Sequence, residues 1–258
     1  MINFFVWLTR CFMRPIRPGQ PIMLDRASAD DRWFGTYGCM VEHAGRRYLL
    51  SCGHTFEGGK QGDTVAWLNM RSRKPGRRVG SLAKVNKGTD SSLIGAHWPA
   101  RVVPGFPRRI GRVDPNPFPM DSLSFVPRTA IHGRVLVQAV GAVSGLTVGY
   151  AASGVFSPIT YTRHPGKKRT RSAAAPASYT LNPAFIEVKP DLSLNPDFCQ
   201  EGDSGALLLT TPGRGLPQPL GLLVAVRRDG LGDFGLAVPI QRVLDDIGAG
   251  ARVLARGR

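Results

Sequence analysis

Cysteines, acidic residues and long apolar runs are all scarce in this sequence. The 258 residues include four cysteines, too few for a disulfide-dense secreted scaffold, which is short and cysteine-rich. The apolar run at residues 2–8 is too short to span a bilayer, which takes about 20 residues. It also lacks the basic flank and the small-residue cleavage site of a secretory signal. We therefore expect no membrane span, and the sequence favours a cytoplasmic over a secreted location.

Basic residues outnumber acidic ones by 34 to 18, which gives a formal net charge of +16 with neutral histidines. This balance excludes an acidic solvating tail. With 42% hydrophobic residues, 31 glycines and 21 prolines, the composition is that of a globular chain. The length suits one large domain or two of roughly 100 to 150 residues. The positive charge is concentrated at residues 71–78, 108–112 and 163–171.

Glycine and proline interrupt the chain at short intervals, and the segments between them are rich in Val, Leu, Ile and Tyr. This spacing predicts an all-β sandwich or barrel. A tight turn at residues 44–45 is expected to join two strands into a hairpin. The predicted strands cover residues 39–43, 46–51, 64–68, 79–85, 91–96, 134–140, 147–152, 185–188, 206–210, 220–226 and 234–239.

One helix and one irregular connection are predicted beside these strands. Apolar residues at 240, 243, 244 and 247 form a single stripe at helical spacing, followed by glycine. Residues 104–127 contain six prolines, and proline has no N–H for a strand ladder. We therefore interpret this stretch as a connection between two halves of the chain.

Three short motifs on this β background carry candidate chemistry. They are SCGH at residues 51–54, TDSSLI at residues 89–94 and GDSG at residues 202–205. A serine hydroxyl is a poor nucleophile near neutral pH and needs a nearby base, which histidine can supply, while a carboxylate orients the imidazole. The order His54, Asp90, Ser204 provides all three groups. Asp63 is an alternative carboxylate, but its turn-like setting is more typical of a surface cap.

In these motifs and in several strands around them, the sequence resembles the chymotrypsin-like (trypsin-like) serine peptidases, in particular their bacterial members. The resemblance implies two antiparallel six-stranded β-barrels with a short C-terminal helix. It also implies an N-terminal segment at residues 1–34 and a first barrel at 35–112 that carries His54 and Asp90. A Pro-rich connection would follow at 113–132, then a second barrel with Ser204 and the helix at 133–247, and a basic tail at 248–258.

The resemblance further implies a serine endopeptidase that acts on proteins or peptides through an acyl-enzyme. Ser204 would be the nucleophile, His54 the general base and then acid, and Asp90 the orienting carboxylate. The backbone N–H groups of Gly202 and Ser204 would form the oxyanion hole. Phe198 would lie at the base of the primary pocket, with Val226 and Gly235 on its walls. An aromatic base offers no counter-charge, which favours a small or apolar substrate side chain, unless Phe198 only packs in the core.

Two departures from the digestive members of this family affect the site. Thr55 follows His54 in place of a cysteine, so the disulfide beside the histidine is absent. No basic residue precedes an Ile-Val-Gly-Gly start, which argues against activation by a freed N-terminal amine that pairs with Asp203. Asp203 must then be satisfied by another group.

Metal, disulfide and binding-module interpretations remain as alternatives. Cys39, His43, Cys52 and His54 do not have a usual zinc spacing, and we expect neither metal nor cofactor. Cys39 and Cys52 could form a disulfide in an oxidising compartment, but reduced thiols are favoured. The alternative function is a basic binding or scaffolding module with a vestigial site. A nucleic-acid partner is less favoured, because the basic runs lack interleaved aromatics. The oligomeric state is not predicted.

Overall fold

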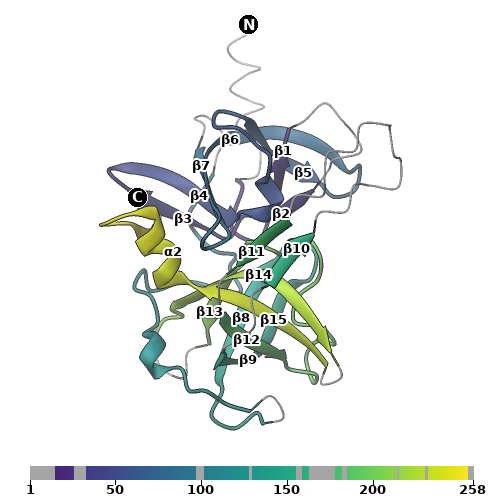
Figure 1. Cartoon of the computed structure of the whole chain (residues 1–258), viewed down its shortest axis with the longest axis vertical. Helices are drawn as coiled ribbons and strands as arrows, with labels where there is room; N and C mark the ends of the chain where they lie inside the picture. The colour runs from purple at the N-terminus through teal and green to yellow at the C-terminus, as the bar shows by residue number, and fades with distance from the viewer. Residues whose placement is uncertain are drawn as a thin grey trace, which may run out of the picture.

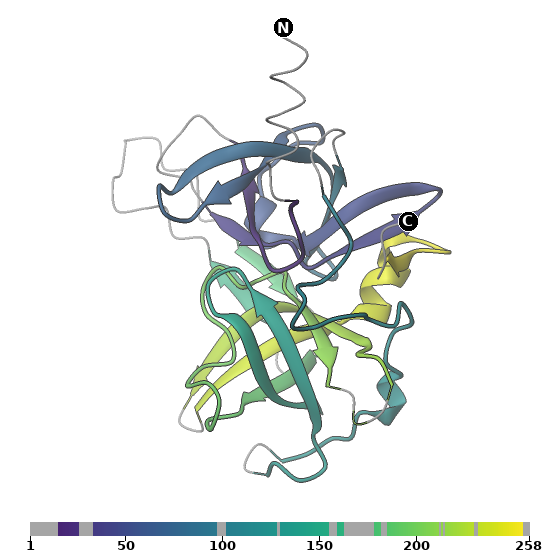
Figure 2. The same ribbon diagram turned by 180° about the vertical axis from the view of Figure 1, so that it is seen from behind.

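The structure is a computed structural model that describes residues 15–25, 33–96, 102–127, 130–154, 159–162, 178–181, 185–211, 213, 215–229 and 232–254. Nearly all regular structure there is strand, arranged in two bodies stacked along the long axis (Figures 1 and 2). The apolar run at residues 2–8 and the basic loop at 163–171 lie outside the described residues. In the part of the chain that is described, no helix is both long and apolar enough to cross a membrane.

The N-terminal body is an open antiparallel sheet of eight strands in the order β16-β3-β4-β7-β6-β5-β1-β2. Its strands are β1 (Pro21–Leu24), β2 (Phe34–Thr36), β3 (Cys39–His43), β4 (Arg46–Cys52), β5 (Thr64–Asn69), β6 (Lys74–Asn86), β7 (Ser91–Ala96) and β16 (Arg252–Leu254). The prediction of a closed six-stranded barrel in this half was therefore wrong.

The reason for the open edge lies in the hydrogen bonds of the short strand β2. Its residue Thr36 donates its backbone N–H to the carbonyl of Ser204 at 2.8 Å, so this edge contacts the other body. Strand β16, from the C-terminal end of the described chain, adds to β3 at the opposite edge. One edge of the sheet thus contacts the barrel through β2, and the other is formed by β16. Within the described residues the two edges are not paired with each other.

The C-terminal body is the closed barrel that the sequence predicts, with strand order β12-β15-β14-β13-β8-β9. Its strands are β8 (Val135–Gly141), β9 (Gly145–Gly154), β12 (Phe185–Pro190), β13 (Leu207–Thr210), β14 (Pro219–Asp229) and β15 (Gly232–Pro239). A separate two-stranded hairpin, β10 (Ile159–Thr162) and β11 (Ser178–Leu181), lies between β9 and β12 in the sequence.

The predicted β3–β4 hairpin and the predicted helix are both confirmed. His43 pairs with Arg46, and the two turn residues between them, Ala44 and Gly45, have φ of 49° and 72°. Positive φ at both central residues is the geometry of a type I′ hairpin turn. Helix α2 (Ile240–Ile247) buries all four residues of the predicted apolar stripe.

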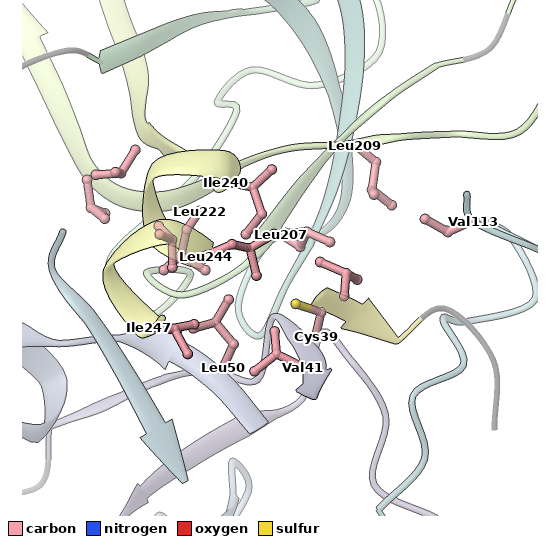
Figure 3. Close-up of a cluster of buried hydrophobic side chains, with 14 of the residues drawn as sticks. Cys39, Val41, Leu50, Val113, Leu207, Leu209, Leu222, Ile240, Leu244 and Ile247 are labelled. Carbon is pink, nitrogen blue, oxygen red and sulfur yellow. The ribbon is translucent and has the colours of Figure 1, made fainter. Parts of the chain in front are cut away.

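A hydrophobic cluster between the two bodies holds them together (Figure 3). Cys39, Val41 and Leu50 enter it from the first sheet, and α2 contributes the residues of its apolar stripe. From the barrel come Leu207, Leu209, Leu222 and Val224 among others. Leu50 lies on the strand that leads to His54, and Leu207 lies on the strand that follows Ser204. The packing therefore fixes the two halves of the candidate site relative to each other.

Candidate active site

His54 is held by Asp90 through two hydrogen bonds, one to its imidazole and one from its backbone N–H. His54 follows strand β4 in the 3-10 helix η2 (His54–Phe56). Its Nδ1 lies 2.6 Å from Asp90 Oδ2, and its backbone N–H donates to Asp90 Oδ1 at 2.6 Å. The Asp90 side chain is fully buried, whereas that of His54 is 13% exposed. The carboxylate thus fixes both the ring and the backbone of the histidine.

Asp90 reaches this position because its backbone is left-handed. Its φ is 47°, a region that aspartate and asparagine enter more readily than other side chains. The residue ends the turn between β6 and β7, and its carbonyl accepts the N–H of Gly53 at 2.7 Å. The neighbouring Thr89 hydroxyl donates to Asp246 at 2.7 Å, which ties the turn to helix α2.

Asp63, the alternative carboxylate, lies elsewhere. Its Oδ2 accepts the backbone N–H of Lys60 at 2.8 Å in an exposed turn. That is the surface cap which its sequence setting indicates.

Ser204 lies on the barrel side of the site, next to the strands that carry the histidine. Its carbonyl accepts the N–H of Thr36, and a Cβ on the next residue, Gly205, would collide with Ser51 and Cys52 at the end of β4. The chain around Ser204 bends sharply, with φ of 100° at Gly202 and 95° at Gly205. In the described part of the chain, the hydroxyl of Ser204 makes one hydrogen bond, to the carbonyl of Val224 at 3.5 Å.

The carboxylate of Asp203 is satisfied entirely by backbone N–H donors. Its Oδ1 accepts from Val143 at 2.8 Å and from Ser144 at 3.1 Å, and its Oδ2 accepts from Gln200 at 2.8 Å. Asp203 is 1% exposed. These three bonds supply the partners that the sequence led us to expect for Asp203. They also fix the backbone next to Ser204 to the turn between β8 and β9.

Two opposing effects set the pKa of His54. Burial alone lowers it, because a buried imidazolium loses its hydration. The Cys52 sulfur and the Asp90 carboxylate, with the hydrogen bonds to both, outweigh burial and hold the pKa well above its ordinary value of 6.5. The imidazole is therefore protonated over a wider pH range than a free histidine.

Several solved structures that this chain resembles in fold are serine proteases. A glutamic acid-specific serine protease, described as using a histidine triad in substrate binding, matches 93% of this chain with all of its own, at 14% identity and a TM-score of 0.54. Cellulomonas bogoriensis chymotrypsin matches 94% of this chain with all of its own, at 16% identity and a TM-score of 0.54. Thermobifida fusca protease A also matches 94% of this chain with all of its own, at 17% identity and a TM-score of 0.53.

The fold resembles that of the chymotrypsin-like serine proteases. No family model matches the sequence, and no curated protein does so either. At these identities the likeness concerns the course of the chain and does not extend to its chemistry.

Phe198, expected at the base of a substrate pocket, is 2% exposed and lies in the core of the closed barrel. Its ring packs between Gly149 and Gly235, where an added Cβ would approach it to 2.8 and 2.9 Å. Val226 pairs with Gly235 across β14 and β15 and is partly buried against the same core. The three expected pocket residues are therefore neighbours, with the aromatic ring on the interior side.

Among the described residues, no group of three histidine, cysteine or acidic side chains could hold a metal ion. Cys39, Cys52 and Cys199, the cysteines that the structure describes, are buried and form no disulfide with one another. Burial raises the pKa of the Cys39 thiol. Cys11 lies outside the described residues.

Sequence reasoning did not assign a role to three residues that contact the site. Cys52 was weighed only as a metal ligand or disulfide partner, yet its sulfur lies beside the ring of His54. Thr36 donates its hydroxyl to the carbonyl of Gly202 at 3.0 Å. Gly141 leaves room for Asp203, because a Cβ there would overlap that carboxylate. No local pattern marks such long-range contacts.

Proposed function

We propose that this protein is a serine endopeptidase that hydrolyses peptide bonds through an acyl-enzyme intermediate. The observation that carries the proposal is the pair of 2.6 Å contacts from Asp90 to the ring and backbone of His54, beside the sharply bent Ser204 loop. A buried carboxylate that fixes one imidazole tautomer is what general-base catalysis by histidine requires. A structural histidine does not need both bonds.

In the proposed reaction, His54 Nε2 takes the proton of Ser204 as Oγ attacks the substrate carbonyl. Asp90 stabilises the imidazolium that forms, and His54 then protonates the leaving amine. Water then attacks the acyl-enzyme. His54 takes the proton of the water and passes it to the Ser204 oxygen, which leaves as the hydroxyl. The hydroxyl of Ser204 must first leave the carbonyl of Val224, and catalytic hydrogen bonds are often formed only when substrate binds.

The oxyanion would be held by the backbone N–H groups of Gly202 and Ser204. Among the described residues, no protein acceptor is bonded to either N–H, so both are free to donate to a ligand. The φ of 100° at Gly202 supports this assignment, since a residue with a side chain rarely adopts it. One such donor is typically worth about 3 kcal/mol of transition-state stabilisation.

For specificity we propose a small or apolar residue before the scissile bond. Phe198, Val226 and Gly235 would form the pocket, and none of them carries a charge that could pair with lysine or arginine. Cleavage of a peptide library would measure the preference. A clear preference for a basic residue would refute the assignment.

Labelling with a fluorophosphonate probe tests the proposed nucleophile. We expect the wild-type protein to be labelled and to hydrolyse peptides within the range of about pH 6 to 9, at those pH values where His54 is neutral. The variants Ser204→Ala and His54→Ala should lose both activities. The exposed residues Ser122 and His132 supply matched controls, and Ser122→Ala and His132→Ala should retain them. A folded wild-type protein without serine-dependent labelling would refute the proposal and favour a binding module.

A further inference from the structure

A buried thiol lies beside the catalytic imidazole, and the proposed reaction does not use it. Cys52 is the last residue of β4, and its Sγ lies 3.9 Å from Nε2 of His54. The same sulfur lies 2.8 Å from Oγ1 of Thr55, a contact in which either atom can donate. Both ring nitrogens of His54 therefore have partners on the protein, Asp90 at Nδ1 and Cys52 at Nε2.

The space for this sulfur is provided by a glycine on strand β2. A Cβ on Gly35 would lie 2.9 Å from Thr55 Oγ1 and 3.3 Å from Cys52 Sγ, both closer than ordinary contacts. It would also lie 2.9 Å from the carbonyl oxygen of Ser204. Because Cys52 is fully buried under this strand, its thiol cannot reach a substrate. Its contact with the proposed reaction is through the histidine.

The proposed nucleophile, Ser204, also has a hydrogen-bond partner other than the base His54. The Ser204 hydroxyl donates to the carbonyl of Val224 at 3.5 Å. Nε2 is the nitrogen that must accept the serine proton, and it is the nitrogen that faces the thiol. Proton transfer from the Ser204 hydroxyl to His54 Nε2 would begin catalysis, and each of these two groups has another partner here.

We propose that Cys52 is a positioning residue whose sulfur competes with Ser204 for His54 Nε2 and so holds the site in a resting state. The inference rests on the proposed function, because it concerns the base of that reaction. A sulfur that accepts the Nε2 proton favours the imidazolium, which cannot serve as a base. This agrees with the raised pKa of His54, to which Cys52 contributes. The titratable groups that act on the ring in the described structure are Cys52 and Asp90.

The test is a pH titration of His54, monitored by NMR of ¹³Cε1-labelled histidine. It is done in a Ser204→Ala background, which prevents self-cleavage. We expect Cys52→Ala to lower the titration midpoint of His54. Cys52→Ser should lower it as well, because the shorter side chain withdraws its polar atom from the ring. Cys39→Ala deletes another buried thiol that does not contact His54, and it should leave the midpoint unchanged. Near-UV circular dichroism confirms folding. If Cys52→Ala does not fold, the midpoint measured in Cys52→Ser decides.

The second measurement is the pH dependence of kcat/KM in chains that retain Ser204. The acid limb should move to lower pH in both Cys52 variants, and activity near pH 6 should rise. An unchanged His54 midpoint in a folded Cys52 variant would overturn the inference, even if every chain hydrolyses peptides. A lowered midpoint without hydrolysis in any chain would support the contact and refute the proposed protease function instead.

Discussion

At the scale of single residues, Asp90 combines a strained backbone with a fully buried charge. Its φ of 47° places both carboxylate oxygens on His54, one on the ring and one on the backbone N–H. Backbone strain of this kind typically costs about 1 to 3 kcal/mol and persists only where the surrounding structure enforces it. The contact with His54, the bond from Gly53 and the tie from Thr89 to α2 are the interactions that enforce it here.

The raised pKa of His54 determines the pH dependence of the proposed activity. The base works only when neutral, so kcat/KM should rise with pH as the imidazole loses its proton. Because the folded-state pKa lies well above 6.5, the midpoint of this rise should also lie above 6.5. A pH profile of kcat/KM with a neutral peptide measures it. A midpoint at or below 6.5 would contradict the raised pKa.

Asp90→Asn should lower kcat by about 10⁴-fold, since an amide no longer enforces the reactive tautomer. Asparagine tolerates the left-handed backbone, so the fold should be preserved. The midpoint of the pH profile should fall as well, because a negative charge beside the ring is removed. Asp63→Asn is the matched control and should leave kcat unchanged. Equal losses in both variants would argue against Asp90 as the orienting residue.

At the scale of elements, the turn between β8 and β9 supports the loop that carries the nucleophile. Two N–H groups of this turn, from Val143 and Ser144, point at the buried carboxylate of Asp203. Gly141 at the end of β8 allows the approach, because a Cβ there would overlap the carboxylate. The position of Ser204 therefore depends on a turn about 60 residues earlier in the chain, through charge-assisted hydrogen bonds.

Gly141→Ala should displace Asp203 and lower the free energy of unfolding by about 2 kcal/mol, a typical cost of overpacking. Labelling of Ser204 should fall with it, because the oxyanion donors flank Asp203. Gly95→Ala is the control, since among the described residues its new Cβ would meet Ser81 O at an ordinary 3.7 Å. Urea unfolding and probe labelling measure the two effects. A Gly141→Ala protein with wild-type stability would show that the carboxylate is not held there.

At the scale of the whole molecule, the site lies across two bodies that share one hydrophobic cluster. His54 and Asp90 belong to the open sheet and Ser204 to the barrel, while α2 packs against strands of both (Figure 3). Loss of packing in this cluster should therefore weaken both the fold and the alignment of the site.

Leu244→Ala should lower the free energy of unfolding by about 3 kcal/mol, the usual cost of a large-to-small change in a core. Leu244 is 4% exposed on α2, whereas Arg242 on the same helix is exposed. Arg242→Ala should change the stability by less than about 0.5 kcal/mol. Denaturant midpoints at an unchanged m-value measure both. Similar effects from the two variants would contradict the role given to the cluster.

The net charge of +16 should affect association with charged substrates. Arg71, Arg73, Lys74, Arg108 and Arg109 are exposed in the described structure, and a positive field raises the encounter rate of acidic peptides. The kcat/KM for a peptide with flanking acidic residues should fall as salt rises, since added ions screen the field. The same cleavage sequence with neutral flanks should show little change. The same salt dependence for both peptides would refute the steering role.

The parts of the fold that sequence predicted best are those with a strong local pattern. The β3–β4 turn has Ala44 and Gly45 between alternating strands, and strand 91–96 and the α2 stripe were placed with their observed bounds. A strand of three or four residues shows little of a period, and the short strands β1, β2, β10, β11 and β16 were missed. Strand β6 begins at Lys74, within the segment expected to be a basic turn, since pairing with β5 extends it.

The sequence by itself determined the order of the three motifs, the β character of the chain and the terminal helix, because these depend on neighbouring residues. Only the tertiary structure decided that the first sheet stays open and that Asp203 is satisfied by backbone donors. It also decided that Asp90 bonds both the ring Nδ1 and the backbone N–H of His54 and that the Cys52 sulfur faces the ring. His54 and Asp90 are 36 residues apart, and Thr36 and Gly202 are 166 apart. Contacts at such separations follow from packing and sheet register, which no local pattern encodes.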